Sequence, residues 1–396
     1  MLSSKVLHNL RNRYIDRFFS SVTNPCNFDL LKESLKARNR HDLLNEIESK
    51  GIENIDHKQL PNLIHPSVIS YGDAPKTEST INEIRKFPKQ PPTFHTICHK
   101  LNLLRMDVGQ YAGSRSYYLM NDLAALETSL ILYAVNRLRS KNFELISVPD
   151  ILPAKNIEAC GMQVHGERNQ VYKLSKKTDG SEMCLSGTSE MALATYLSGK
   201  TFKVDELPKR FMAVSRCFRA ETSNLNEEKG IYRVHQFNKV EMFGVCGPEQ
   251  SEEFLNEFKT IQIDLFKDLG LHCKVLDMPP FELGSPAYRK YDIESWMPGR
   301  EMFGELSSCS NCTDYQSSRL NIKLENGEFA HTINGTAAAI PRLLIAIIEN
   351  FQNPKGFIEI PKVLRKYMKK DRITKTKVLP EVKLVKEISK ESLLEN

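Results

Sequence analysis

The chain has 396 residues, of which 40% are hydrophobic and 26% are charged, so it can bury a substantial core and is not expected to be disordered. It contains no run of about eighteen or more apolar residues, so no membrane span is predicted. The formal net charge of +6 permits a polyanionic partner such as RNA without requiring one. Nine cysteines at irregular spacing favour a reducing compartment over a disulfide framework.

Residues 1–25 combine basic and apolar side chains with a single acid, Asp16. The basic residues are Lys5, Arg11, Arg13 and Arg17. This composition is typical of an amphipathic mitochondrial transit peptide, so we expect this segment to lie outside the fold and the protein to act in the mitochondrial matrix. The alternative is a basic N-terminal helix that docks on the body of the protein.

Apolar spacing predicts two short helices within residues 26–60, containing Leu30, Leu31 and Leu35 and then Leu43, Leu44 and Ile47. Residues 61–93 are predicted to be a linker, because the region is rich in Pro, Gly, Lys and Ser. The main domain is predicted to cover residues 94–370. Residues 371–396 form a charged C-terminal tail, for which we expect a mobile extension in solvent rather than an RNA contact.

Two helices are predicted in the first half of the main domain. Asp122–Lys141 has leucine and alanine at helical spacing, and a strand is predicted at Phe143–Val148. The segment Leu185–Glu190 opens the second helix. The available capping residues are Asn121 for the first helix and Thr188 or Ser189 for the second.

Arg219–Glu241 is predicted to be a strand, a loop and a returning strand. Because side chains alternate between faces with a period of two, one face of the returning strand carries Arg233, His235, Phe237, Lys239 and Glu241. By the same parity Arg219 and Glu221 share a face of the first strand. Buried charges need partners, so this combination of cations, carboxylates and a ring indicates a ligand site. The alternative is a solvated hairpin face with alternating charge.

Regular elements continue after this hairpin. A helix is predicted over Glu249–Leu269, with strands at Cys273–Leu276 and Tyr291–Trp296. Thr332–Arg342 then leads into an apolar helix. Pro341 is tolerated only near the start of that helix, where its missing N–H would be unpaired in any case.

The segment Gly304–Asn311 places the carboxylate of Glu305 beside several hydroxyl groups. Such oxygen donors suit a hard cation such as Mg²⁺, which binds through one or two protein oxygens together with phosphates. Cys309 and Cys312 form a lone Cys-x-x-Cys without a second pair or a histidine at zinc spacing, so no zinc site is predicted.

The sequence from Cys217 to Glu221 and from His235 to Phe237 resembles motif 2 of the class II aminoacyl-tRNA synthetases, and is similar to that of the animal mitochondrial seryl-tRNA synthetases. The helix and strand before Pro149 resemble motif 1, the dimer interface of that class, and Thr332–Arg342 resembles motif 3. The resemblance implies an α+β fold, in which an antiparallel sheet is flanked by helices and the catalytic domain covers residues 94–370. It also shows a departure, because the family's long coiled-coil arm for tRNA is replaced by the short helical remnant at residues 26–60.

The resemblance implies roles for individual residues. The residues implied to bind ATP are Arg219, Glu221, Arg233, Val234, Phe237, Glu305, Ser308 and Arg342. Those implied to bind serine are Thr188, Ser189, Glu190, Arg219, Lys239, Glu241, Asn334 and Thr336. Catalysis is assigned to Arg219, Glu221 and Arg342, and magnesium to Glu305 and Ser308.

A member of this family would activate serine with ATP and Mg²⁺ and transfer it to mitochondrial tRNA-Ser, as a homodimer or as a heterodimer with a related subunit. No membrane partner is expected. One alternative is an inactive relative that acts as a tRNA-binding or regulatory partner, which the shortened arm favours. Another is an arm-less ligase that loads a carrier protein, although the usual zinc-ligand pattern of such enzymes is not evident in the sequence.

Overall fold

The computed structural model describes residues 25–56, 59–106, 112–113, 115–165, 169–175, 180–221 and 230–376. The predicted transit peptide, except for its last residue, lies outside these ranges, as do the loop residues 222–229 and the tail beyond residue 376. In the described ranges no helix has the length and apolar character needed to cross a membrane.

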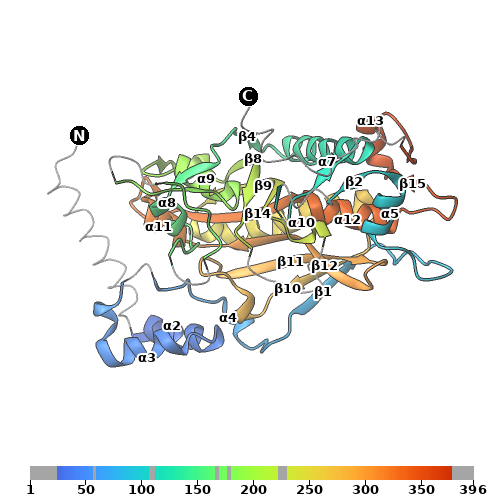
Figure 1. Ribbon diagram of the computed structural model, residues 1–396. Coiled ribbons are helices and arrows are strands. Elements are labelled where there is room, and N and C mark those ends of the chain that lie inside the picture. Colours follow the sequence, from blue (N-terminus) through green and yellow to red (C-terminus); the bar gives the residue numbers. More distant parts are fainter. Residues whose placement is uncertain are drawn as a thin grey trace, which may run out of the picture.

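An eight-stranded sheet forms the centre of the protein, in the order β1-β10-β11-β12-β14-β9-β8-β4 (Figure 1). Its strands are β1 (Lys76–Ile81), β4 (Glu144–Leu145), β8 (Lys209–Phe218), β9 (Gln236–Cys246), β10 (Cys273–Asp277), β11 (Arg289–Met297), β12 (Met302–Asn311) and β14 (His331–Ala339). Neighbouring strands are antiparallel except β4 and β8, which are parallel. The predicted mixed fold with a large antiparallel sheet is confirmed.

The helices are α2 (Pro25–Ala37), α3 (His41–Lys50), α4 (Pro66–Ile69), α5 (Phe94–Leu101), α7 (Asp122–Arg139), α8 (Ala154–Ala159), α9 (Ser189–Tyr196), α10 (Ser251–Leu269), α11 (Tyr315–Leu320), α12 (Ile340–Asn350) and α13 (Arg365–Met368). The short strand pairs are β2 (Leu104–Arg105) with β3 (Tyr118–Leu119), β5 (Ile151–Pro153) with β6 (Met183–Leu185), β7 (Thr201–Phe202) with β13 (Lys323–Leu324), and β15 (Ile358–Glu359) with β16 (Arg372–Ile373). A 3₁₀ turn, η5 (Gly230–Tyr232), precedes β9.

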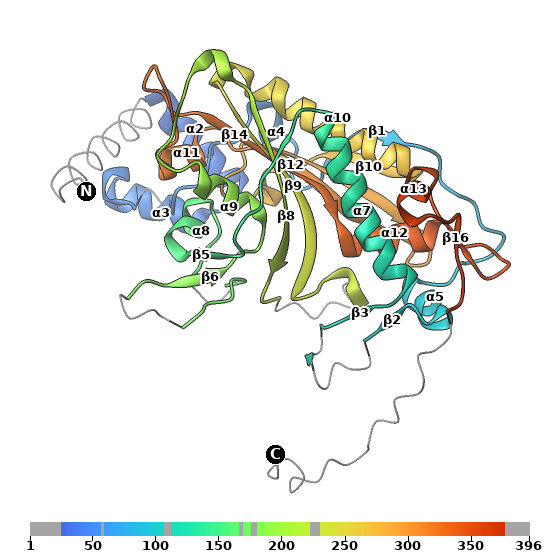
Figure 2. The ribbon, with the colours of Figure 1, turned by 90° about the horizontal axis from the view of Figure 1, so that it is seen from above.

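The two faces of the sheet carry different cores, because side chains alternate along each strand. On β9, Val240 and Met242 belong to the core that contains residues of α7, α10 and α12, whereas Phe243 and Val245 belong to the core that contains residues of α8, α9 and α11. Figure 2 shows these two groups of helices on either side of β8 and β9. By parity, Glu241 faces the same side as Phe243, so the polar site lies on the α8–α9–α11 face.

The structure corrects several local predictions. Asn121 precedes α7, but its side chain makes no capping hydrogen bond. The strand predicted at Phe143–Val148 is reduced to the two residues of β4. The predicted linker contains β1, which pairs with β10 at the edge of the sheet. Five of the six side chains of β1 are exposed, so its hydrophobic pattern is too weak to predict a strand.

The two short helices predicted near the N-terminus are α2 and α3, which pack on each other through leucine and isoleucine side chains. They are attached to the body by Arg38, which is only 8% exposed. Its guanidinium donates to four main-chain carbonyls, those of Asn62, Leu283, Gly284 and Ala287. A buried cation is thus held by peptide dipoles.

Candidate active site

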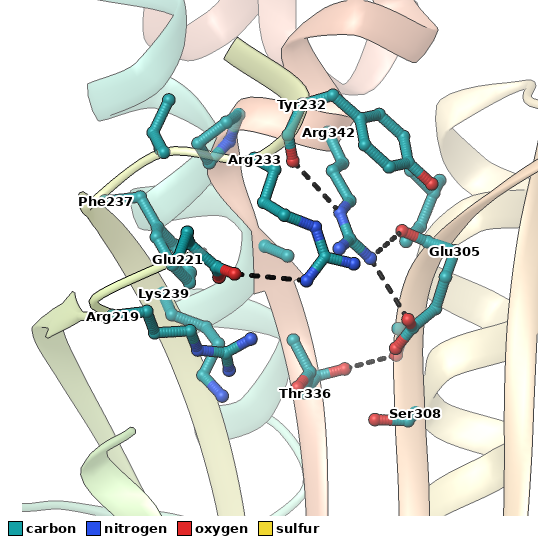
Figure 3. A pocket seen from close by; sticks show the side chains of 15 residues that line it. Arg219, Glu221, Tyr232, Arg233, Phe237, Lys239, Glu305, Ser308, Thr336 and Arg342 are labelled. Atoms are coloured by element: carbon teal, nitrogen blue, oxygen red, sulfur yellow. Dashed lines mark hydrogen bonds and ion pairs between the residues drawn. The ribbon is translucent and has the colours of Figure 1, made fainter. Parts of the chain in front are cut away.

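A pocket opens on the polar face of the sheet, between the β8–β9 hairpin, β12 and the start of α12 (Figure 3). It encloses about 620 Å³, including space open to solvent. Its lining residues are Arg219, Glu221, Tyr232, Arg233, Val234, Phe237, Lys239, Glu305, Leu306, Ser307, Ser308, Thr336, Ala339, Pro341 and Arg342. All residues that the sequence assigns to ATP or to magnesium are therefore brought to one cavity.

The hairpin differs from the predicted one in where its strands end. β8 ends at Phe218 and β9 starts at Gln236, so Arg219, Glu221 and Arg233 lie just beyond the paired strands. The N–H of Arg219 still donates to the carbonyl of His235 at 2.8 Å, which continues the ladder by one step. The predicted alternation holds for Phe237 and Lys239, and the side chains beyond the strands reach the same pocket from the loop.

Two ion pairs lie in the pocket. Arg233 Nη1 lies 3.1 Å from Oε2 of Glu221, whose side chain is 3% exposed. Arg342 Nη1 lies 3.1 Å from Oε2 of Glu305 and also donates to the carbonyl of Glu305 at 3.0 Å. Burial by itself would raise the pKa of Glu305, but attraction to Arg342, Lys290 and Arg219 outweighs burial and lowers the pKa to about 2. Glu305 is therefore ionised at neutral pH.

The guanidinium of Arg219 packs on an aromatic ring at the pocket. Its guanidinium carbon lies 5.4 Å from the centroid of the Phe237 ring, a cation–π contact that fixes the fork over the pocket. Its Nε is buried and has no hydrogen-bond partner in the described part of the chain. Because a buried guanidinium N–H without an acceptor is costly, this donor indicates an anionic or carbonyl group of a substrate.

Beside these ion pairs, a buried polar network connects residues of the strands β9 and β14 with residues of the helices α9 and α11. Lys239 Nζ lies 2.8 Å from Oε2 of Glu241, and both side chains are less than a tenth exposed. The hydroxyl of Thr336 donates to Glu241 at 3.1 Å. Next to this pair, Oε1 of Glu190 accepts from Asn334 Nδ2 at 2.7 Å. The network offers two carboxylates, Glu190 and Glu241, to a small cationic or hydroxylated ligand.

Neighbouring groups shift the pKa of Glu190 in both directions. Burial raises its pKa above the ordinary value, and the neighbouring carboxylate of Glu241 raises it further. Hydrogen bonds from Gln316 and Asn334 and the positive charge of Lys239 act in the opposite direction, but the net shift of the pKa is upward. An ammonium group of a ligand would favour the ionised form.

The remaining predicted serine-binding residues lie at the start of α9. The Thr188 side chain caps the helix by accepting from the N–H of Glu190 at 3.4 Å, so the predicted cap is confirmed. Ser189 is 1% exposed, and its hydroxyl has no partner within the described residues. Neither residue lines the pocket that contains Arg219, nor do Glu190, Glu241 and Asn334. Glu241 is connected to the pocket through Lys239 and Thr336, which line it.

The donors of Glu305 and Ser308 fit a magnesium ion. Both side chains line the pocket, Glu305 is ionised, and Ser308 supplies a hydroxyl oxygen. Among the described residues no group of three or more His, Cys, Asp or Glu side chains could hold a metal ion. A carboxylate together with a hydroxyl suits a cation that keeps water and takes further oxygens from phosphates.

Two residues of the site were missed in the sequence. Tyr232 lies under the guanidinium of Arg342, 4.6 Å from ring centroid to Cζ, and its carbonyl accepts from Arg342 Nε at 3.4 Å. Gln316 on α11 donates to Glu190 at 2.5 Å. No sequence signal marks Gln316, but the position of Tyr232 within the hairpin loop could have suggested a site role for it.

Comparison with known proteins defines the class. The family model described as tRNA synthetase class II core domain (G, H, P, S and T) matches residues 172–351, which include the hairpin, Glu305 and Arg342. The sheet and its cation-rich pocket are therefore those of a class II aminoacyl-tRNA synthetase.

Individual relatives narrow the assignment. The chain is 44% identical over 325 residues to the mitochondrial serine-tRNA ligase of Bos taurus, and the match covers 80% of this chain and 62% of that protein. It is 40% identical over 355 residues to the mitochondrial serine-tRNA ligase of Saccharomyces cerevisiae, covering 86% of this chain and 77% of that one. The crystal structure of the Pyrococcus horikoshii seryl-tRNA synthetase complexed with ATP superposes with a TM-score of 0.74 at 29% identity, covering 94% of this chain and 90% of that chain. The chain belongs to the serine-tRNA ligase family, which confirms the resemblance read from the hairpin.

Proposed function

We propose that this chain is a mitochondrial serine-tRNA ligase, which activates serine with ATP and transfers it to tRNA-Ser. The observation that carries the proposal is the position of Arg219, whose buried Nε has no acceptor among the described residues and which lines one pocket together with Arg233, Lys239 and Arg342. The relatives named above carry this activity in their names, and the Pyrococcus horikoshii enzyme was solved with ATP. Because the chain spans only 62% of the length of the Bos taurus relative, the activity of the whole protein is a proposal.

In the first step, a carboxylate oxygen of serine attacks the α-phosphorus of ATP, the bond to the bridging oxygen breaks, and pyrophosphate leaves. Such a reaction depends mainly on positioning and charge stabilisation. Arg219 would hold the α-phosphate and the attacking carboxylate together, because its planar fork can donate to two oxyanions. Arg342 would meet the γ-phosphate or stack on adenine, with Phe237 covering a ring face. Glu221, with Arg233 and Val234 beside it, would contact the adenine amino group.

Glu305 and Ser308 would hold the magnesium ion at the phosphate end of the pocket. The ion would supply positive charge to the phosphate oxygens. The low pKa of Glu305 keeps this carboxylate available at neutral pH. Arg342 already shares that carboxylate, so the same two side chains would organise both the metal and the phosphates.

Serine would occupy the polar network behind the phosphates. Glu190, with Thr188 and Ser189 at the start of its helix, would receive the ammonium group, and Asn334 holds Glu190 in place. Glu241 and Thr336 would bind the hydroxyl, with Lys239 balancing the buried charge. Alanine would leave these polar groups unpaired, which gives the site a physical basis for selecting serine.

In the second step, a ribose hydroxyl at the end of tRNA-Ser attacks the carbonyl carbon of seryl adenylate, and AMP leaves. Residues 222–229 lie outside the described ranges, and we propose that they meet the acceptor end because they stand in the chain between the pocket-lining residues Glu221 and Tyr232. We infer a dimer, either of this chain or with a related subunit, from the resemblance of α7 and β4 to motif 1. The mitochondrial relatives support a mitochondrial location, and we propose the matrix.

Serine-dependent exchange of labelled pyrophosphate into ATP tests the first step with the purified chain. The expected result is exchange that requires serine and magnesium and is not supported by alanine. Charging of a mitochondrial tRNA-Ser transcript then tests the second step. Absence of exchange would contradict the proposed activation, whereas exchange without charging would favour a carrier other than tRNA.

A further inference from the structure

Gln316 is a fully buried glutamine whose side-chain amide is bonded at both ends. Its Nε2 donates to Oε1 of Glu190 at 2.5 Å, and its Oε1 accepts from the hydroxyl of Thr332 at 2.8 Å. An ionised carboxylate only accepts hydrogen bonds, so the amide must turn its NH₂ group toward Glu190. The hydroxyl of Thr332 then donates to the amide oxygen and holds the other end of the side chain.

The hydrogen bonds to Glu190 leave one carboxylate oxygen for a ligand. Gln316 and Asn334, at 2.5 and 2.7 Å, both donate to Oε1. None of the hydrogen bonds within the described part of the chain uses Oε2. Two donors on one oxygen thus fix the carboxylate and leave Oε2 for a cationic group.

We propose that Gln316, oriented by Thr332, is a positioning residue that fixes Glu190 for the ammonium group of the substrate amino acid. This inference rests on the proposed function, because it concerns the same amino-acid site. Gln316 acts through Glu190 and not by touching serine. A leucine of similar size would fill the same space but would supply no donor to the carboxylate.

The charges around Glu190 make this support necessary. Burial and the carboxylate of Glu241 raise the pKa of Glu190, whereas Gln316, Lys239 and Asn334 act against that rise. Two thiols, Cys160 and Cys312, also face Glu190, and burial raises their pKa values well above the ordinary range, so they stay neutral. Removal of the Gln316 donor would shift Glu190 further toward its protonated form, which cannot pair with an ammonium group.

The test is the affinity of the full chain for serine, measured by calorimetry between pH 6 and pH 8.5, with the affinity for ATP as a second readout. In the Gln316→Leu variant we expect serine to bind about tenfold more weakly near pH 7. The deficit should shrink as the pH rises, because Glu190 regains its charge, and ATP should bind as in the wild type. Thr332→Val should show a smaller loss with the same pH trend.

Ser318→Ala provides a matched control on the same helix, because the Ser318 hydroxyl donates to the carbonyl of Tyr315 and not to Glu190. It should leave serine affinity unchanged. The proposal is overturned if Gln316→Leu binds serine as the wild type does, or if serine and ATP weaken equally at every pH. If Gln316→Leu does not fold, an unchanged affinity in Thr332→Val overturns it. A wild-type chain that binds ATP but not serine would overturn the proposed function as well.

Discussion

Arg342 Nη1 lies 3.1 Å from Oε2 of Glu305, so the cation proposed to meet the phosphates and the carboxylate proposed to hold magnesium are paired with each other. The Arg342 side chain is 18% exposed and that of Glu305 is 38% exposed. A nucleotide with its metal would therefore enter a site whose charges are already organised, and Glu305 would have to serve Arg342 and the metal together.

Replacement of Glu305 by glutamine should weaken magnesium use. The amide keeps the shape of the side chain but has no charge, so we expect the magnesium concentration for half-maximal pyrophosphate exchange to rise about tenfold. Glu294 on β11 is the residue directly opposite Glu305 on β12, but it does not line the pocket. Glu294→Gln is therefore the matched control. An unchanged magnesium requirement in Glu305→Gln would remove this residue from the metal site.

The pH response of the same pair follows from the lowered pKa of Glu305. The ionised carboxylate of Glu305 contributes its full stabilisation of the folded protein above the ordinary pKa of 4.5. This contribution is lost only as the pH falls through about 2. We therefore expect the magnesium requirement of the wild type to show no titration of Glu305 between pH 5 and pH 8. A magnesium titration repeated across this range checks the expectation.

Arg219→Ala should abolish activation and leave the fold intact. The variant removes the donor that we propose for the α-phosphate, and loss of one such donor in an active site lowers kcat by about 10²–10³-fold. Arg219→Lys keeps the positive charge but not the planar fork, so we expect it to recover only part of the exchange rate. Far-UV circular dichroism and the Tm are the controls, and normal exchange in Arg219→Ala would contradict the assigned role.

Glu190→Gln should separate stability from function. Because the pKa of Glu190 is raised, the folded protein holds this proton more tightly than the unfolded chain does. The free energy of unfolding therefore falls as the pH rises above 4.5, the ordinary pKa of a glutamate. The glutamine variant should therefore have a Tm higher by about 2 °C or more at pH 7, and the gain should disappear near pH 4. Thermal unfolding at the two pH values measures this difference.

The same variant should lose serine affinity by about 100-fold, because an amide cannot form a charge-assisted pair with an ammonium group. The amide oxygen of the new side chain can still accept from Gln316 and Asn334, so no donor is left unpaired. If the Glu190→Gln variant binds serine as the wild type does, the ammonium group of serine does not bind at Glu190.

Arg38→Met should detach the N-terminal helices. The methionine keeps much of the length of the side chain but removes the donors to four carbonyls, which leaves several buried acceptors unpaired. We expect stability to fall by about 2–4 kcal/mol and limited proteolysis to cut between α3 and β1 sooner than in the wild type. Arg40→Met, at an exposed pair with Asp42, is the control and should change neither measurement. Equal protease resistance in Arg38→Met would show that other contacts hold these helices, such as the hydrogen bond from the Ile64 N–H to the Ser34 hydroxyl at 3.1 Å.

The sequence by itself determined the local elements and the class of site. Helical spacing predicted α7 and α10, a hydroxyl at Thr188 or Ser189 predicted the start of α9, and the period of two placed Phe237 and Lys239 on one face. These features depend on a few neighbouring residues and on backbone geometry, so they can be read without a fold.

Only the tertiary structure decided which distant residues meet. Glu190 is more than a hundred positions away from Gln316 and from Asn334, yet both donate to its carboxylate. Asn334 lies on β14, which the order of the sheet places between β9 and β12. The sequence also gave no sign of the edge strand β1 or of the burial of Arg38. Hydrogen bonds to main-chain groups hold both of them, and such bonds leave no apolar pattern in the sequence. Hydrophobic periodicity predicts which residues are buried, whereas the order of strands in the sheet decides which partners the buried polar groups meet.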